Sequence, residues 1–381
     1  MCPTTPQACV AIIAGEASGD LHGAKLIQAM QQKRPGLFYC GIGGPALKQA
    51  GVRILVDASE LTVVGITEVF AKLPGILKGM ATIKKLLSSL KPDLLILIDF
   101  PDFNLHVAAT AKKLGIPVLY YISPQIWAWR RGRVKRIGRL VDRMAVILPF
   151  EEQFYTENHV AATFVGHPLL DSVLPAADQV ISSGGQGPVT IGLMPGSRDS
   201  EISRHLPVML DTAHILKDRL KHASFIISHA PSVARQQIEM IVASHAGRMD
   251  VEIISETVET VFARSDVIVA ASGTVTLQAA IHGTPMVIIY KVSPVSFLLG
   301  RALVRVPHIG LVNLVAGQEL VPELVQKAAS AQNIASAVEN LLADPSQLNQ
   351  LKQQLFALRD VLGGGGASEK VAALALEILG D

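Results

Sequence analysis

Acidic side chains follow an apolar segment at the point where a buried strand would end. The run Leu94–Ile98 leads directly into Asp99, and Asp102 lies a few residues further on. In open α/β sheets, ligands bind outside the carboxyl ends of the strands. An Asp that is partly buried there has a raised pKa and can act as a general base. We therefore predict that Asp99 is catalytic, whereas Asp102 can equally cap a helix that begins near Asn104.

A second candidate site lies at the turn 15–20, Gly-Glu-Ala-Ser-Gly-Asp, which follows the apolar run 10–14. Its small residues allow a tight turn and the close approach of a ligand to the backbone. The turn also brings Glu16, Ser18 and Asp20 to the carboxyl end of what we expect to be the first strand. We predict that this turn is part of a binding site.

Two further turns have the character of anion sites. Pro195–Arg198 and Ser272–Thr274 each separate an apolar strand pattern from a helical pattern. Backbone N–H groups at a helix start attract anions, and Ser197 and Arg198 add a hydroxyl and a planar cation suited to phosphate oxygens. Together the turns could hold a diphosphate. Neither matches G-x-x-x-x-G-K-[ST], so a nucleotide would be a leaving group rather than an energy source. An ordinary turn with a solvated Arg and a simple helix cap are the alternatives.

The segment 123–130, Ser-Pro-Gln-Ile-Trp-Ala-Trp-Arg, contains both tryptophans of the chain, Trp127 and Trp129. A basic run begins at its end and includes one acidic residue, Asp142. Such a run is typical of a solvated helix face or of a nucleic-acid surface. Because we expect it on a single helix, and because the net charge is only +2, we predict no nucleic-acid partner and favour a phosphorylated or membrane-bound acceptor. The basic residues are Arg130, Arg131, Arg133, Lys135, Arg136, Arg139 and Arg143.

The segment 63–90 combines apolar residues at helical spacing with several lysines. Cationic amphipathic helices bind anionic membrane surfaces, although a core-facing helix with a solvated lysine face fits the same pattern. The apolar residues include Val69, Phe70, Leu73, Ile76 and Leu77, and the lysines are Lys72, Lys78, Lys84 and Lys85.

Short apolar strand patterns alternate with helical patterns along the chain, which predicts parallel sheets built of βα units. The small-residue segment 181–188 is the clearest linker. Since 381 residues exceed what one core usually serves, we predict two similar lobes. The expected ranges are 1–180, 189–345, and 346–381 for C-terminal helices hinged at the glycines 363–366.

Apolar residues make up 49% of the chain, but the longest apolar runs are far shorter than the roughly 18 residues of a spanning helix. No basic residue precedes Lys25 and no cleavage pattern follows the first apolar run, so we expect a cytoplasmic protein without a signal peptide. Cys2, Cys9 and Cys40 lack the spacing of a zinc site or a disulfide framework. We expect neither a metal nor a cofactor.

Seven motifs follow one another along nearly the whole chain, at 15–20, 98–104, 123–130, 166–168, 195–198, 271–274 and 313–320. In this order they resemble the motifs of the lipid A disaccharide synthase family. The resemblance implies a GT-B fold, in which two Rossmann-like domains with parallel sheets face a central cleft. It also implies an inverting glycosyltransferase that joins UDP-2,3-diacylglucosamine to 2,3-diacylglucosamine 1-phosphate (lipid X), giving a β-1,6-linked disaccharide 1-phosphate and UDP.

The resemblance also suggests a role for each lobe. The first lobe would bind the acceptor and the anionic cytoplasmic face of the inner membrane, through the apolar surface around Leu73, Ile76 and Leu77. Asp99 would take the proton of the acceptor's 6-hydroxyl, and the oxygen would displace UDP in line, with Arg198 and the two helix starts stabilising the departing charge. The acceptor-side residues would be Glu16, Ser18, Trp129 and Arg130.

The second lobe would hold the UDP-sugar. Related transferases often place a Glu on the helix after the Ser-Gly-Thr turn to hold the ribose, and Gln278 takes that place here. An amide still bonds to hydroxyls, and Asn313 or Glu319 could share the contact. A homodimer is left open. The donor-side residues would be Ser197, Arg198, Ser272, Gly273, Thr274, Gln278, Asn313 and Glu319.

Several rival functions fit part of the pattern. A UDP-N-acetylglucosamine 2-epimerase and the transferase that makes lipid II share the two-lobed fold. A dinucleotide-dependent oxidoreductase is suggested by the glycines of 41–44, Gly-Ile-Gly-Gly, which lack the G-x-G-x-x-G fingerprint. A non-catalytic membrane or nucleic-acid module would explain the basic and amphipathic segments but leave both anion turns unexplained.

Overall fold

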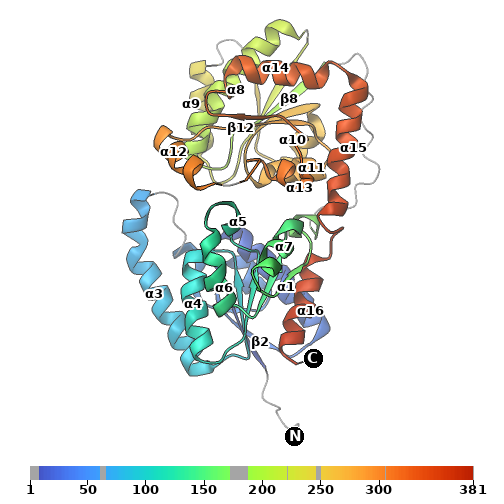
Figure 1. Ribbon diagram of the computed structural model, residues 1–381. Helices are drawn as coiled ribbons and strands as arrows, with labels where there is room; N and C mark the ends of the chain where they lie inside the picture. Colours follow the sequence, from blue (N-terminus) through green and yellow to red (C-terminus); the bar gives the residue numbers. More distant parts are fainter. Residues whose placement is uncertain are drawn as a thin grey trace. The chain divides into compact units, whose positions relative to one another are not determined.

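The computed structural model describes residues 8–60, 66–171, 188–220, 222–245, 250–304 and 306–380, and its helices and strands are drawn in Figure 1. The side chains of residues 66–74, 295, 296, 299, 302 and 303 lie outside this description. The chain forms two compact units. Unit 1 comprises Met1–Leu174 and Leu362–Asp381, and unit 2 comprises Pro175–Val361.

Unit 1 is built on a parallel sheet with the strand order β3-β2-β1-β4-β5-β6-β7. Its central strands are buried along their whole length, as expected for strands covered on both faces. The strands are β1 Cys9–Ala14, β2 Phe38–Gly43, β3 Arg53–Asp57, β4 Leu94–Ile98, β5 Val118–Tyr121, β6 Arg143–Val146 and β7 Ala162–Phe164.

Helices cover both faces of this sheet (Figure 1). On one face, β1 residues such as Ile12 pack with α1 Ala17–Lys33 and α16 Ala367–Ile378, and α2 Pro45–Gln49 adjoins α1. On the other face, Ile13 and Leu97 pack with α3 Ile66–Leu90, α4 Pro101–Lys113, α6 Val134–Leu140 and α7 Pro149–Glu157. Shorter elements complete the unit: α5 Ile126–Trp129 and the 3₁₀ turns Ala58–Glu60, Arg131–Arg133 and Pro168–Asp171.

Unit 2 repeats this plan with a parallel sheet in the order β10-β9-β8-β11-β12-β13. One face packs against α8 Asp199–Arg219, α9 Arg235–His245 and α14 Ala331–Leu342. Towards the other face lie α10 Val258–Arg264 and α11 Thr274–Ile281, and α15 Pro345–Val361 packs on α11. The strands are β8 Thr190–Met194, β9 Ser224–Ser228, β10 Glu252–Ile254, β11 Val267–Ala271, β12 Met286–Tyr290 and β13 Glu323–Val325, and the remaining helices are α12 Pro294–Leu303 and α13 Leu311–Ala316.

The strand order decides where ligands can bind. In unit 1 the order reverses between β1 and β4, and in unit 2 it reverses between β8 and β11. Open α/β sheets bind ligands in the crevice at this reversal, outside the carboxyl ends of the strands. The turns at Gly15 and Asp99 follow β1 and β4, and those at Pro195 and Ser272 follow β8 and β11. All four turns singled out in the sequence therefore stand at reversal points.

The expected fold class of two parallel-sheet α/β domains is confirmed. The sequence patterns missed the edge strands β3 and β13, in which no residue is buried. The predicted linker 181–188 lies outside the described residues except for its last position. The helices expected together as 346–381 are divided: α15 belongs to unit 2 and α16 to unit 1. The predicted helix break at 363–366 is confirmed, and all of its glycines have positive φ.

In the portion of the chain that is described, no helix combines the length and apolar character required to span a bilayer.

Candidate functional site

The two anion turns of unit 2 line one pocket of about 340 Å³. The pocket brings together residues that lie some 75 positions apart in the sequence, because β8 and β11 are paired in the sheet. Ser228, the last residue of β9, and Val258 of α10 also line it. The predicted donor residues in this lining are Ser197, Arg198, Ser272, Gly273, Thr274 and Gln278.

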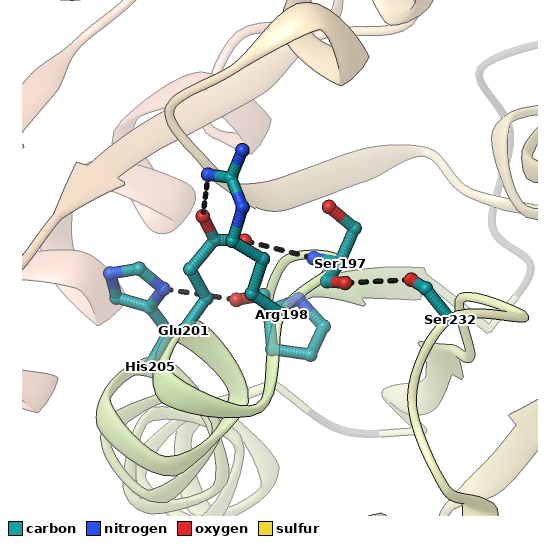
Figure 2. A network of polar contacts seen from close by, with 6 residues as sticks. Ser197, Arg198, Glu201, His205 and Ser232 are labelled. Atoms are coloured by element: carbon teal, nitrogen blue, oxygen red, sulfur yellow. Dashed lines mark hydrogen bonds and ion pairs between the residues drawn. The ribbon is translucent and has the colours of Figure 1, made fainter. Parts of the chain in front are cut away.

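The first of these turns is held from several sides (Figure 2). The Ser197 backbone N–H donates to Glu201 Oε2 at 2.9 Å, and the Ser197 carbonyl accepts from the Ser232 hydroxyl at 2.7 Å. Below the turn, the buried His205 ring lies between the Pro195 carbonyl, 2.9 Å from Nδ1, and the Lys291 backbone N–H, which donates to Nε2. Burial lowers the pKa of His205. A neutral ring protonated on Nδ1 satisfies both contacts.

The second turn is open towards the pocket. Gly273 is the N-cap of α11, and a Cβ added there would meet nothing within 4 Å. Thr274 is exposed, and the Ser272 hydroxyl donates to the Ile309 carbonyl at 3.2 Å. The backbone N–H groups of the first turn of α11 thus face a region that a ligand can approach, as anion binding at a helix start requires.

Asn313 and Glu319, the other two predicted donor-side residues, are not among the described residues that line this pocket. Asn313 is fully buried, and its amide donates to the Val321 carbonyl and Glu323 Oε1, both at 2.8 Å. Its Oδ1 accepts from the backbone N–H groups of Leu320 and Val321. These bonds use the hydrogen-bonding capacity of the amide. Asn313 therefore organises the segment before β13, whereas Glu319 is exposed, and a ribose contact by either remains a prediction.

We expect Asn313→Ala to lower the free energy of unfolding by about 2–4 kcal/mol, because it leaves the Leu320 and Val321 N–H groups without their acceptor and removes one donor from the Glu323 carboxylate. Chemical denaturation followed by circular dichroism measures the change. Glu319→Ala, in the same segment but exposed, is the control and should stay within about 0.5 kcal/mol. An Asn313→Ala protein as stable as the native one would contradict the structural role.

Asp99 of unit 1 occupies a constrained position directly after β4. Its φ is 45° and that of Phe100 is 48°, both in the left-handed region that non-glycine residues avoid. The Asp99 carbonyl accepts from the Tyr120 hydroxyl at 2.6 Å and from Asn104 Nδ2 at 2.7 Å, and both of these side chains are fully buried. Such strain persists only where surrounding contacts over-determine the backbone, and it concentrates at functional sites.

The environment of Asp99 suits a general base. Burial, the largest cause, and the charge of the nearby Glu16 raise the pKa of Asp99 from 3.8 to about 6, against a lowering effect of the Phe100 backbone N–H. Glu16 is close because β1 and β4 are paired, with Ala14 opposite Ile98. A carboxylate with a pKa near 6 is largely ionised at pH 7 and more basic than an ordinary Asp.

Replacing Glu16 by Gln should shift the acidic limb of the kcat/KM profile to lower pH. A general base acts in its ionised form, so if Asp99 is the base the rate falls as the pH drops through its pKa. Removing the Glu16 charge lowers the pKa of Asp99, and activity then persists further into the acid range. Ser18→Ala removes a neutral neighbour in the same turn and should leave the limb in place. An unshifted limb in Glu16→Gln would refute the charge coupling.

The turn after β1 divides into exposed and structural residues. Glu16 and Ser18 are exposed, and Glu16 is the N-cap of α1. Asp20 is buried, and its carboxylate accepts from the backbone N–H groups of Gly44, Ala46 and Leu47. Asp20 therefore caps α2, and the glycine-rich segment 41–44 contributes the Gly44 N–H group to this contact. Gly15 leaves room for the Phe100 ring, which a Cβ would overlap.

Trp129 and Arg130 follow β5, the neighbour of β4. The Arg130 guanidinium stacks on the Trp129 ring at 4.0 Å, and Trp129 is 42% exposed. Arg133 forms an ion pair with Asp102 at 2.6 Å, and Arg130 lies 3.9 Å from the same carboxylate. These contacts connect the predicted acceptor-side residues Trp129 and Arg130 to the first turn of α4.

Two sequence expectations for this region are wrong. The basic run does not form one helix, because after Arg130 it is divided among a 3₁₀ turn, α6 and the first residue of β6. Two of its arginines pair with carboxylates outside the run, Arg133 with Asp102 and Arg143 with Glu377, whereas Asp142 pairs with Lys112. The helix expected near Asn104 begins at Pro101, so Asp102 lies in its first turn and Phe100 is the N-cap.

The amphipathic segment is helical over α3, and two of its candidate membrane contacts have described side chains. Ile76 packs partly against the core, and Leu77 is 61% exposed. Val69, Phe70 and Leu73 lie outside the described side chains. Farther along, Ile83 and Leu87 are buried in the sheet–helix core, so this part of α3 follows the core-facing interpretation.

Several residues that organise the site were not selected from the sequence. Tyr120 sits within a strand, and nothing in its local pattern indicates a bond to Asp99. Glu151 is buried, accepts from Trp127 Nε1 at 2.9 Å and from two backbone N–H groups, and burial raises its pKa to about 7. Among these residues, only Glu201 has a local sequence feature that could have indicated its role, as an acidic residue in the first turn of a helix.

Among the described residues, no group of His, Cys, Asp or Glu suits a metal ion.

Sequence comparison shows close relatives of this chain among known proteins. The chain is 48% identical to the lipid-A-disaccharide synthase of Geobacter metallireducens (strain ATCC 53774 / DSM 7210 / GS-15) over 99% of both sequences. It is 48% identical to that of Geobacter sulfurreducens (strain ATCC 51573 / DSM 12127 / PCA) over 97% of each.

Solved structures share the fold at low identity. A UDP-GlcNAc 2-epimerase from Neisseria meningitidis bound to UDP-GlcNAc superposes with a TM-score of 0.65 at 14% identity, covering 97% of this chain and all of that one. The structure of Acinetobacter baumannii MurG superposes with a TM-score of 0.59 at 16% identity, covering 98% of this chain and 100% of that one. The fold is thus the GT-B type expected. A family model described as lipid-A-disaccharide synthetase matches residues 10–376. The chain therefore belongs to the lipid-A-disaccharide synthetase family.

Proposed function

We propose that this protein transfers a 2,3-diacylglucosaminyl group from UDP-2,3-diacylglucosamine to the 6-hydroxyl of 2,3-diacylglucosamine 1-phosphate. The products are the β-1,6-linked disaccharide 1-phosphate and UDP. The observation that carries the donor assignment is the pocket of unit 2, where a guanidinium, two hydroxyl-bearing turns and the start of α11 line one cavity at the reversal point of the sheet. Family membership supports the choice of lipid substrates.

Each unit has a distinct task in this proposal. In unit 1, Asp99 takes the proton from the acceptor hydroxyl, and the freed oxygen forms a bond to C1 of the donor sugar. The bond from C1 to the diphosphate oxygen breaks with its electron pair leaving on UDP. Arg198 and the N-terminus of α11 stabilise the charge that develops on the diphosphate. Attack opposite the leaving group inverts the anomeric centre.

Thin-layer chromatography of the reaction with both diacylated sugars tests the assignment. We expect a disaccharide 1-phosphate that forms only when donor and acceptor are supplied together, with one UDP released per disaccharide. UDP-N-acetylglucosamine alone is the control, because an epimerase would convert it without an acceptor. Conversion of that sugar nucleotide, or the absence of disaccharide, would refute the proposal.

We also propose that the protein works at the cytoplasmic face of the inner membrane, with α3 as a contact to anionic lipids. Two acylated substrates require access to a lipid surface, and Leu77 is an apolar side chain exposed on a helix that also carries Lys78, Lys84 and Lys85. Burying exposed apolar side chains in the interface and attracting lysines to anionic lipids both favour binding.

The protein should sediment with vesicles containing an anionic phospholipid at low salt, and Leu77→Ser should reduce the bound fraction. Leu90→Ser is the matched control, since it changes an exposed leucine (45%) at the C-terminal end of the same helix, away from Leu77. Failure of the native protein to sediment, or equal loss in both variants, would contradict the role of α3.

A further inference from the structure

A carboxylate stands inside the donor pocket of unit 2. Glu201 is in the first turn of α8 and lines the pocket together with Ser197 and Arg198. Its Oε2 accepts from the Ser197 backbone N–H at 2.9 Å, and its Oε1 lies 3.0 Å from Arg198 Nη1 (Figure 2). One side chain therefore contacts both residues of the turn that we assign to the diphosphate.

The Glu201 carboxylate links the long, flexible side chain of Arg198 to the backbone of Ser197. The Arg198 side chain is 67% exposed, whereas the Glu201 side chain is 28% exposed. An exposed Arg has several rotatable bonds, and ordering it on binding a ligand opposes affinity. The charge-assisted bond to Glu201 uses one of the five N–H donors of the guanidinium, and the other donors remain available for phosphate oxygens.

The turn makes room for this contact. Gly196 has a φ of 121°, and a Cβ at this position would come within 2.5 Å of Glu201 Oε2 and 2.7 Å of its Cβ. A glycine is therefore required both for the backbone conformation and for the packing of Glu201 over the turn.

We propose that Glu201 is a positioning residue of the diphosphate site, which holds the Arg198 guanidinium against the Ser197 backbone in an orientation ready for a nucleoside diphosphate. This inference rests on the proposed function, because it assumes that the pocket takes UDP. The turn itself keeps its other supports when Glu201 is changed, since Ser232 and His205 bind the Ser197 and Pro195 carbonyls. Loss of Glu201 should therefore affect Arg198 more than the backbone of the turn.

Isothermal titration with UDP and with uridine tests the proposal. Glu201→Ala should weaken UDP binding by about tenfold, the scale of one charge-assisted hydrogen bond, and leave uridine binding within about twofold. Ser232→Ala is the matched control, because it removes a neutral bond to the same turn and should change UDP affinity by less than about twofold. If Glu201→Ala does not fold, Glu201→Gln serves instead, since its single acceptor oxygen cannot serve both donors.

A double-mutant cycle separates positioning from a general effect on α8. If Glu201 acts through the guanidinium, adding Glu201→Ala to Arg198→Ala should cause no further loss of UDP affinity. Additive losses, or an unchanged or higher UDP affinity of Glu201→Ala alone, would overturn the proposal. Failure of the native protein to bind UDP would instead refute the donor assignment on which it rests.

Discussion

Asp99→Asn is expected to lower kcat by roughly 10²- to 10⁴-fold, the range associated with loss of a general base. Asn keeps the size of the side chain and leaves the Asp99 carbonyl free to accept from Tyr120 and Asn104, so the strained backbone retains its supports. The lost property is the ability to take a proton near pH 6. UDP affinity should be nearly unchanged, because the diphosphate residues belong to unit 2. Initial rates with both lipid substrates and titration with UDP give the two quantities.

Asp102→Asn is the control for this experiment. Asp102 lies on the same segment and is also an acid, but its side chain is 76% exposed and pairs with Arg133. An exposed ion pair contributes little to stability, so we expect turnover within a few-fold of native. If Asp99→Asn keeps native turnover, or if both variants lose turnover equally, Asp99 is not the base.

Arg198→Ala should lower kcat/KM for the donor by roughly 10²- to 10³-fold, comparable to removal of one donor that stabilises charge in a transition state. The guanidinium assists the diphosphate in the bound donor and more strongly as negative charge develops on UDP. UDP affinity should therefore fall together with the rate, which distinguishes this variant from Asp99→Asn. Arg198→Lys retains a positive charge without the planar fork, so its kcat/KM for the donor should lie between those of the native protein and Arg198→Ala.

Arg204→Ala provides the comparison for Arg198. Arg204 is an exposed arginine of α8, the helix whose N-cap is Arg198, and it is not among the residues that line the pocket. We expect native donor KM and kcat in this variant. Native UDP affinity and turnover in Arg198→Ala would mean that the diphosphate site lies elsewhere.

Much of the fold could be predicted from the sequence because local patterns encode it. Central strands such as β1 and β4 are continuous apolar runs, since both faces of a parallel sheet are covered. Small residues and helix starts marked the turns after β1, β8 and β11. The edge strands β3 and β13 have weaker apolar patterns, because an edge strand buries less of its surface and none of their residues is buried.

The candidate site was predicted in part for the same reason. Ser197 and Ser272 are local turn residues, and their turns proved to share a pocket. Asn313 also stands in a recognisable motif, yet its amide is consumed by the backbone around Leu320. Whether a polar side chain faces a ligand or its own chain depends on its hydrogen-bond partners in the folded protein, and these partners cannot be read from a sequence motif.

The sequence by itself determined the βα alternation, the turns that carry polar residues and the acid that follows β4, because each depends on neighbouring residues. Only the tertiary structure decided that these turns meet in pairs, since the pairing of β1 with β4 and of β8 with β11 joins distant segments. It also decided the return of α16 to unit 1 and the bond from the Tyr120 hydroxyl to the Asp99 carbonyl. Packing in three dimensions selects such contacts, and the spacing of residues along the chain does not.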